Sequence, residues 1–163
     1  MELVVGQNSY ITLAEANDIV ASNFISTSSE KKLWDSLDDN DKAVIIVSTT
    51  TKYDTDAMCY IGYKDDVNQK LQFPRVLNNG EIVECPDTIK IGLILQALKD
   101  LQTDNSEEAE LISKGVTSYK IKDASISLSA DMINSNKHES GLNFDIWKLY
   151  FEKYSNLGKY IAI

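Results

Sequence analysis

Residue types that could do chemistry are few in this sequence, and they lie far apart. The single histidine, His138, has no obvious nucleophile beside it, whereas a catalytic base needs a positioned partner. Cys59 and Cys85 form no CxxC or Cys/His pattern, which predicts free thiols and no zinc site. The phosphate-binding pattern GxxxxGK and the nucleophile pattern GxSxG do not occur. We therefore expect a protein that is not an enzyme and that uses no cofactor.

The acidic turn at residues 38–41 raises the question of a calcium site. An EF-hand loop places oxygen ligands at alternating positions and adds a glycine and a distal glutamate. Here Ala43 stands where the third ligand should be, and no glycine follows. We instead expect Asp39 to cap the helix that follows it.

The charge balance disfavours several kinds of partner. The chain has 16 Lys and Arg residues against 25 Asp and Glu residues, so its net charge is −9 and its pI is about 4.6. Clustered cations drive binding to nucleic acids and to anionic membranes, and the aromatic residues here are not interleaved with a basic patch. No apolar run approaches the roughly 20 residues of a membrane span, and the first residues lack the basic region of a signal peptide. We expect no membrane partner and a protein that stays in the cytoplasm in which it is made.

The longest helical pattern follows the second of two prolines, and the other elements must be placed around it. Pro86 suits the first turn of a helix, and Asp87 puts negative charge at the positive end of the helix dipole. Apolar residues cover well over half of the helix circumference, which is more than a surface helix needs. We therefore predict a central helix at about 86–102 that is packed on several sides. Its apolar positions are Ile89, Ile91, Leu93, Ile94, Leu95, Ala97, Leu98 and Leu101.

A loop of fixed shape precedes the central helix. Pro74 restricts its own backbone and favours an extended Phe73, which we expect to be anchored in the core. The Asn78-Asn79-Gly80 sequence is a strong turn signal. Arg75 is the only arginine, and its planar fork can bond a carboxylate or backbone carbonyls. It could form a salt bridge within the fold or contact a neighbouring subunit.

Shorter helices are predicted before this loop. Thr12 and Glu15 match a capping box for a helix that ends near residue 23. Ser28 or Ser29 can cap a short helix around Trp34. The β-branched run within 41–53 would also suit a strand, but its length, caps and apolar spacing favour a helix.

Two regions between the predicted helices lack a strong pattern. Residues 54–70 read as irregular, with Tyr60, Ile61 and Tyr63 packed over the helices. Residues 107–114 are predicted to form a short solvent-exposed helix, because a run of acidic residues is typical of a helix face in contact with water.

The pattern changes to a period of two after residue 115. Residues 116–130 predict a β-hairpin that turns at Lys122-Asp123, and a lone hairpin is marginally stable in water. A connector at 131–143 precedes an amphipathic helix at 144–154 and a short apolar tail. The tail could pair with the hairpin or add to a partner's sheet. We thus predict a mainly α fold: a small helical bundle around the central helix (1–130, with the hairpin appended), then a connector, C-terminal helix and tail (131–163).

Four segments together resemble a family of tailed-phage and prophage proteins. They are GQNSYITLAEANDIV, WDSLDDNDKAVIIVSTTTKYD, LQFPRVLNNGE and CPDTIKIGLILQALKDL, and they cover about residues 6–103. The motif NSYxxLAEA and the FPR loop are the most specific. Members are often labelled DnaT-like single-strand DNA-binding proteins, and they are also similar to head-completion or head–tail adaptor proteins of the phage neck. Residues 131–163 have no match in this resemblance.

The resemblance implies a structural role in the virion neck. It implies a ring beneath the portal protein, expected to be a dodecamer, that extends the DNA channel and docks the next neck or tail-terminator protein. A dodecamer would carry on the order of a hundred negative charges, so DNA could slide through an acidic lumen without specific binding. The same charge opposes ring closure, so we expect a monomer or weak oligomer until the portal templates the ring.

Three functional hypotheses follow, of which the adaptor is the first. The second is a single-strand DNA-binding accessory protein, and the third is a cytoplasmic interaction domain without a phage role. For the adaptor we predict partner contacts at the loop, the hairpin and the tail. The hairpin and the tail have strand edges whose backbone hydrogen-bonding groups a small helical domain cannot pair. The predicted contact residues are Phe73, Pro74, Arg75, Tyr119, Ile121, Ile126, Leu128, Leu157, Tyr160, Ile161 and Ile163.

Overall fold

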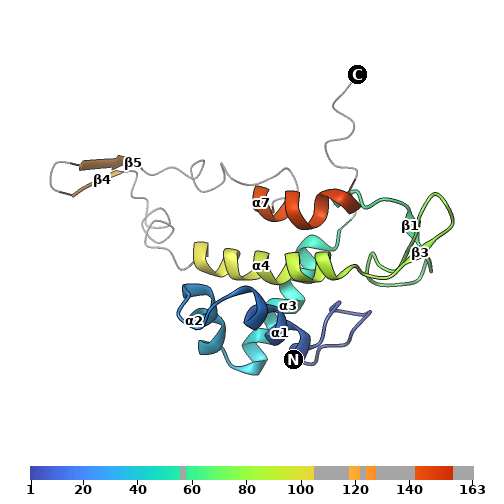
Figure 1. Cartoon of the computed structure of the whole chain (residues 1–163), viewed down its shortest axis with the longest axis horizontal. Coiled ribbons are helices and arrows are strands. Elements are labelled where there is room, and N and C mark those ends of the chain that lie inside the picture. The colour runs from blue at the N-terminus through green and yellow to red at the C-terminus, as the bar shows by residue number, and fades with distance from the viewer. Residues whose placement is uncertain (56–57, 105–117, 122–123, 128–141, 156–163) are drawn as a thin grey trace, which may run out of the picture.

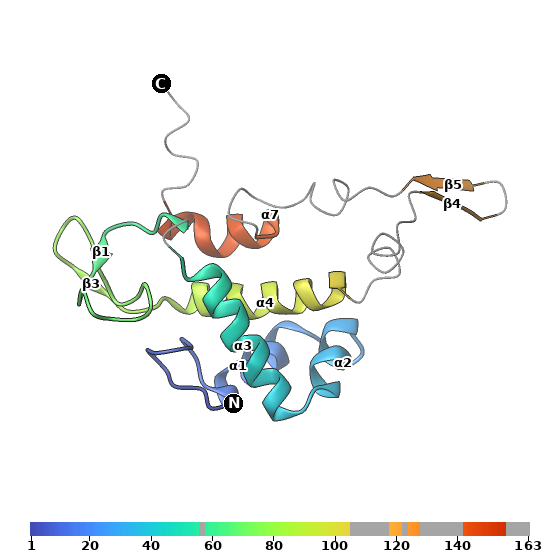
Figure 2. The same ribbon diagram turned by 180° about the vertical axis from the view of Figure 1, so that it is seen from behind.

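The computed structural model describes residues 1–55, 58–104, 118–121, 124–127 and 142–155. The body is helical and is arranged around α4 (Asp87–Asp104). Helices α1 (Leu13–Asn23) and α2 (Ser29–Ser36) lie on one side of α4, and a C-terminal helical segment lies on the opposite side (Figure 1). Helix α3 (Asp39–Tyr53) crosses α4, as the view from behind shows (Figure 2). The predicted fold class, mainly α with a β-hairpin, is confirmed.

The N-terminal ends of the first three helices carry side-chain caps. Thr12 and Glu15 form the predicted capping box, in which the Glu15 N–H donates to Thr12 Oγ1 and the Thr12 N–H donates to Glu15 Oε2. Ser28 caps α2 through the Lys31 N–H. The predicted N-cap of α3 was wrong by one residue, because the cap is Asp38 and not Asp39. Asp39 is already the first helical residue of α3.

The β-branched run is helical, and α3 buries one face of it. Its buried residues recur at helical spacing, so packing against α4 outweighs the modest preference of β-branched residues for strands. The helix α4 starts at Asp87, and its Lys90 N–H donates to the carbonyl oxygen of Pro86. The buried residues of α4 include Ile89, Leu93, Ile94, Gln96, Ala97 and Leu98.

The predicted C-terminal helix is present, but it is not a regular α-helix. It consists of an α-helical turn α7 (Phe144–Ile146), a π-helical stretch η2 (Trp147–Phe151) and a 3₁₀ turn η3 (Glu152–Tyr154). Trp147 and Phe151 are buried against α4. The approach is closest at Gly92, where an added Cβ would lie 2.5 Å from Phe151 Cε2. The segment therefore completes the core of its own chain.

A small sheet precedes α4, in a region that the sequence predicted to be irregular or a loop. Strands β1 (Tyr63–Lys64), β2 (Arg75–Val76) and β3 (Ile82–Val83) pair antiparallel in that order. Each strand has two residues, which is too short for an alternating pattern to be visible in the sequence. The predicted turn at Asn78–Gly80 joins β2 to β3, and Gly80 has a φ of +82° that favours glycine.

The second antiparallel pair is the predicted hairpin, formed by β4 (Ser118–Ile121) and β5 (Ala124–Ser127). Ile121 is the register partner of Ala124, so residues 122 and 123 connect the strands as expected. Both views draw the hairpin beyond the C-terminal end of α4 (Figures 1 and 2).

Among the helices of the described residues, none combines the length and apolar character needed to cross a bilayer.

Candidate functional site

Arg75 lies inside the loop region that the sequence singled out, and it is 7% exposed. Its Nε donates to the Ile61 carbonyl oxygen at 2.9 Å, and its Nη2 donates to the carbonyl oxygens of Tyr60 and Gly62. Its Nη1 donates to Gln72 Oε1 at 2.7 Å. The fork therefore ties residues 60–62 to the loop. Arg75 thus lies within the fold, as one of the two expectations held, but the acceptors of these hydrogen bonds are carbonyl and amide oxygens and not the carboxylate of the expected salt bridge.

The two residues before Arg75 differ in their exposure. Phe73 is buried, as predicted, and packs edge-to-face on Tyr60 and Tyr10 with ring centroids 5.2 and 6.0 Å apart. Pro74 follows a cis peptide bond and is half-buried. In this conformation a partner can reach Pro74, whereas Phe73 and Arg75 face the interior. The prediction that this loop contacts a partner stays a prediction.

A pair of polar side chains, the buried Tyr10 and the half-buried Asp54, holds the other side of the loop. The Tyr10 hydroxyl donates a short hydrogen bond to Asp54, the residue that ends α3. The Gln72 N–H donates to Asp54 at 3.0 Å, and the Phe73 N–H donates to the Tyr10 oxygen at 3.2 Å. Burial raises the pKa of Asp54, and the hydrogen bond from Tyr10 opposes that rise. Burial and the nearby Asp54 raise the pKa of Tyr10, so its hydroxyl stays a donor.

Sequence reasoning missed this Tyr10–Asp54 pair. The two residues are 44 positions apart and belong to no motif, so only the packing of the N-terminal segment against the end of α3 brings them together. Their chemistry is structural, because both groups bond to each other and to backbone N–H groups of the loop.

Cys59 and Cys85 are free thiols, as predicted. Cys85 is half-buried beside the start of α4. Burial raises the pKa of the Cys85 thiol, which disfavours the nucleophilic thiolate. Cys59 is exposed and has a left-handed φ of 51°.

The small sheet presents one apolar row to solvent. The strand register places Tyr63 opposite Val76 and Val76 opposite Ile82, so the three residues share one face; we call them the apolar row. Tyr63 is 63% exposed and Ile82 is 57% exposed. The expectation that Tyr63 packs over the helices was wrong, because the register turns it away from the Arg75 side of the sheet.

Carboxylates flank the apolar row in sequence. Asp65 and Asp66 follow β1, while Glu81 precedes β3 and Glu84 follows it, and all four are exposed. The basic side chains of these strands belong to the other row, since Lys64 pairs with Arg75. The exposed apolar row is therefore flanked in sequence by exposed carboxylates.

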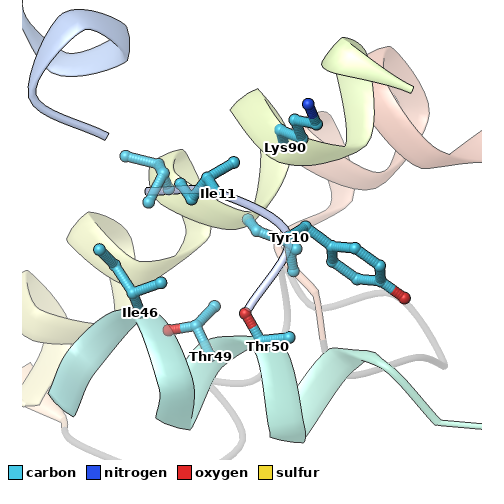
Figure 3. A pocket seen from close by; sticks show the side chains of 8 residues that line it. Tyr10, Ile11, Ile46, Thr49, Thr50 and Lys90 are labelled. Atoms are coloured by element: carbon cyan, nitrogen blue, oxygen red, sulfur yellow. The ribbon is translucent and has the colours of Figure 1, made fainter. Parts of the chain in front are cut away.

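The cavity between the N-terminal segment, α3 and α4 is too small for a ligand. Its volume is about 10 Å³, which is close to the least that holds one water molecule. Tyr10 and Ile11 face Thr49 and Thr50 of α3 across it, and Lys90 lies on the α4 side (Figure 3). In the described part of the chain no group of three His, Cys, Asp or Glu residues is placed to hold a metal ion.

A polar network fastens the C-terminal helical segment to α4. The Asn143 N–H donates to Oε1 of the buried Gln96 at 2.8 Å, and Gln96 Nε2 donates to Asp100 at 2.7 Å. Lys52 of α3 donates to the same carboxylate at 2.9 Å. At the other end of the segment, Ser155 Oγ donates to the Met58 carbonyl oxygen at 2.6 Å. The sequence had left open whether this segment packs on its own chain, and these contacts show that it does.

Of the predicted contact regions, the hairpin lies partly, and the tail wholly, outside the described residues. The hairpin positions Tyr119, Ile121 and Ile126 lie on described strands, and Tyr119 is the register partner of Ile126. Leu128 and the tail residues Leu157, Tyr160, Ile161 and Ile163 lie outside the described residues. The short acidic helix predicted at 107–114 lies outside them as well, and so do residues 131–141 of the connector predicted at 131–143.

Comparison with known proteins gives one family. The family model described as "Putative DnaT-like ssDNA binding protein" matches residues 2–137, which is most of the chain. Neither the curated protein sequences nor the solved structures gave a match.

Proposed function

The chain belongs to the family described as "Putative DnaT-like ssDNA binding protein", and from that premise we propose that it is a structural head–tail adaptor of a tailed-phage neck. In this role it forms a ring below the portal protein, extends the DNA channel and docks the next neck or tail protein. It performs no catalysis. Its place is the neck of the virion, and DNA passes through the ring without specific binding.

The observation that carries this proposal is the acidic surface. The net charge is −9, and within the described residues many basic groups are already engaged. Lys31, Lys52 and Lys90 pair with carboxylates, and Arg75 is buried. Such a surface repels phosphates, which suits a channel wall that DNA must slide past.

The fold supports a scaffold that offers separate docking elements. The helices and the C-terminal segment close a single core around α4, which provides a rigid body. The hairpin is a two-stranded ribbon, and such a ribbon is marginal in water unless a further surface supports it. A hairpin attached to a rigid core fits an assembly protein, which must contact a neighbour.

A single-strand DNA-binding accessory protein is the second candidate, and the family description favours it. Such a protein binds through a basic groove with stacking aromatic residues, and its affinity falls steeply with salt. The exposed Tyr63 could stack on a base, but the exposed carboxylates around it oppose a phosphate backbone. The charge therefore ranks this function second.

One co-sedimentation experiment separates the two functions. The protein is mixed with the portal protein of the same phage and with a fluorescent single-stranded oligonucleotide, and the portal is then pelleted. The adaptor predicts that the protein travels with the portal in stoichiometric amount while the oligonucleotide stays behind. If the protein does not pellet with the portal, and if it binds the oligonucleotide in a parallel tube without portal, the accessory function is established instead.

A further inference from the structure

The turn between β2 and β3 holds two neighbouring residues that can react with each other. Asn79 and Gly80 form the only Asn-Gly pair of the chain, and both are exposed. When glycine follows asparagine, its backbone nitrogen can attack the carbon of the asparagine side-chain amide, because the glycine has no side chain to block the approach. Among the described residues, no atom beyond the chain neighbours lies within 4 Å of the place where a Cβ at Gly80 would be. The amide of Asn79 is therefore open to attack from the Gly80 nitrogen.

The side chain of Asn79 is held along the backbone in the direction of this nitrogen. The Glu81 N–H donates to Asn79 Oδ1 at 3.1 Å, and Asn79 Nδ2 donates to Glu81 Oε2 at 3.2 Å. Both bonds reach across Gly80, as in the turns that asparagine forms with the residue two positions on. The Glu81 N–H also draws electrons from the amide carbon, and it stays in place as a donor when Oδ1 gains negative charge during the attack.

One hydrogen bond of the turn opposes the reaction, and the adjacent asparagine shows the importance of the glycine. The Gly80 N–H donates to the Leu77 carbonyl oxygen at 2.9 Å, so this bond must open before the nitrogen can lose its proton. Such local openings cost little free energy at an exposed turn. Asn78 is exposed in the same turn, but it precedes Asn79, whose side chain hinders the corresponding attack. The turn therefore contains one reactive asparagine and an unreactive neighbour.

We propose that Asn79 is a site of spontaneous deamidation in the folded protein. The Gly80 nitrogen loses its proton to hydroxide and bonds to the side-chain carbon of Asn79. The bond from that carbon to Nδ2 breaks, and the leaving nitrogen takes a proton from water and departs as ammonia. Water then opens the resulting succinimide ring at one of its two carbonyl groups, which leaves aspartate or isoaspartate at position 79. Either product changes the net charge from −9 to −10, and the reaction does not depend on the adaptor function.

The isoaspartate product alters the connection between the two strands. Its main chain runs through the former side-chain carbon, so it carries one extra methylene group between β2 and β3. The Leu77 N–H donates to the Glu81 carbonyl oxygen at 2.8 Å across this turn, and a longer main chain displaces that pair. The pairing of Arg75 with Val83 lies directly beyond it and should become looser.

Peptide mapping of the full-length chain tests the site. The folded protein is incubated at neutral and at mildly alkaline pH and is then digested with trypsin, which releases residues 76–90 with both asparagines of the turn. Fragmentation by mass spectrometry should place the change from amide to carboxyl at Asn79, at a rate that rises with pH, while Asn78 stays intact. Isoaspartyl methyltransferase should label the same peptide. Absence of the product at Asn79, or equal conversion of Asn78, would overturn the proposal.

Two variants at one position test the part played by the Glu81 N–H. Glu81→Ala and Glu81→Pro both lack the carboxylate and keep the carbonyl group that accepts from Leu77, but only the proline variant lacks the N–H. Deamidation of Asn79 should be about tenfold slower in Glu81→Pro, which is the worth of one hydrogen bond to a developing charge. Circular dichroism checks that both variants are folded. Equal rates in the two folded variants would contradict the role given to this donor.

Hydrogen exchange measures the effect on the sheet. The isoaspartate form is separated by anion exchange, and the exchange of amide hydrogens in residues 75–83 is compared with that of the natural chain. Exchange should be faster in the isoaspartate form than in Asn79→Asp, which has the added charge without the added methylene group. Equal exchange in the two forms would show that the longer main chain leaves the strand pairing intact, contrary to the proposed effect.

Discussion

Arg75 shows how one side chain can replace a stretch of regular structure. The guanidinium supplies donors to the three consecutive carbonyl oxygens of residues 60–62, which directly precede β1. A lysine ammonium is a compact charge and cannot span the same acceptors from one position. The sheet, and therefore the apolar row on its exposed face, depends on this fork.

We expect Arg75→Lys to lower the free energy of unfolding by about 2–3 kcal/mol, because buried carbonyl groups lose their donors. Urea denaturation of the full chain measures the change. Lys32→Arg, a replacement in the reverse direction at an exposed position, should stay within about 0.5 kcal/mol. A loss at Arg75 no larger than at Lys32 would show that the fork is dispensable.

The half-buried Asp54 makes a contribution to stability that depends on pH. Its pKa is raised in the folded state, so the folded protein holds this proton more tightly than the unfolded chain does. The resulting stabilisation is complete below the unfolded pKa and is lost as the pH rises through the folded pKa. Asp54→Asn removes this dependence, so the stability advantage of the natural chain over the variant should widen as the pH falls from neutral toward about 4.

Urea unfolding of both proteins across that pH range checks the expectation. Tyr10→Phe serves as a comparison, because it removes the hydrogen bond to Asp54 but keeps the carboxyl group. A gap between the natural chain and Asp54→Asn that is constant, or that narrows in acid, would contradict the assignment of a raised pKa to Asp54.

At the scale of elements, the C-terminal helical segment is held by shape as well as by hydrogen bonds. Gly92 permits the close approach, because any side chain there would meet Phe151 and the Cβ of Tyr150. The π-helical turn at Trp147–Phe151 lies at this contact and places both Trp147 and Phe151 toward the core. The segment is thus part of the helical core and not a separate appendage.

Gly92→Ala should destabilise the protein by about 1–3 kcal/mol, although alanine favours helices, because overpacking at Phe151 outweighs the gain in propensity. The variant should also be cleaved faster by protease within residues 142–155, which mass spectrometry can locate. Thr88→Ala, at an exposed site in the first turn of α4, provides the control and should change neither property appreciably. A stabilised Gly92→Ala variant would mean that the segment packs less closely than the structure indicates.

The apolar tail is the element that we predict to bind the portal. Deleting residues 157–163 should abolish co-sedimentation with the portal while circular dichroism and the melting temperature of the helical core stay unchanged. The physical reason is that the tail lies beyond Ser155, where the described core contacts end. Undiminished portal binding by the truncated chain would exclude the tail as the contact.

At the scale of the whole molecule, net charge and interface chemistry act in opposite directions. Each copy carries −9, so bringing many copies into one ring is opposed by a repulsion that salt screens only in part. The contacts between subunits of the proposed ring must supply a local attraction at each interface. The portal can supply the remaining free energy by holding the copies next to one another.

We therefore expect monomers or small oligomers, and no complete ring, at about micromolar protein concentration and about 0.15 M salt. Mass photometry with and without portal makes the comparison directly. A complete ring in the absence of portal would show that the subunit contacts overcome the charge without a template.

The sequence by itself determined the elements that depend on local rules. Capping by Thr12 and Ser28, the helical span of α4 and the turn position of the hairpin all follow from the preferences of neighbouring residues, and the structure confirms them. The acidic charge, and the partners that it disfavours, also follow from composition alone. Among the predicted helix caps, that of α3 was misplaced by one residue, because adjacent aspartates can both serve.

The tertiary structure alone decided which distant residues meet. The Tyr10–Asp54 pair, the carbonyl partners of Arg75 and the docking of residues 142–155 on α4 join positions that no local pattern connects. The three-stranded sheet escaped prediction because its two-residue strands are stabilised by Arg75 and by the loop, not by their own propensity. The apolar row exists only through the register of that sheet, so it could not have been found from the sequence.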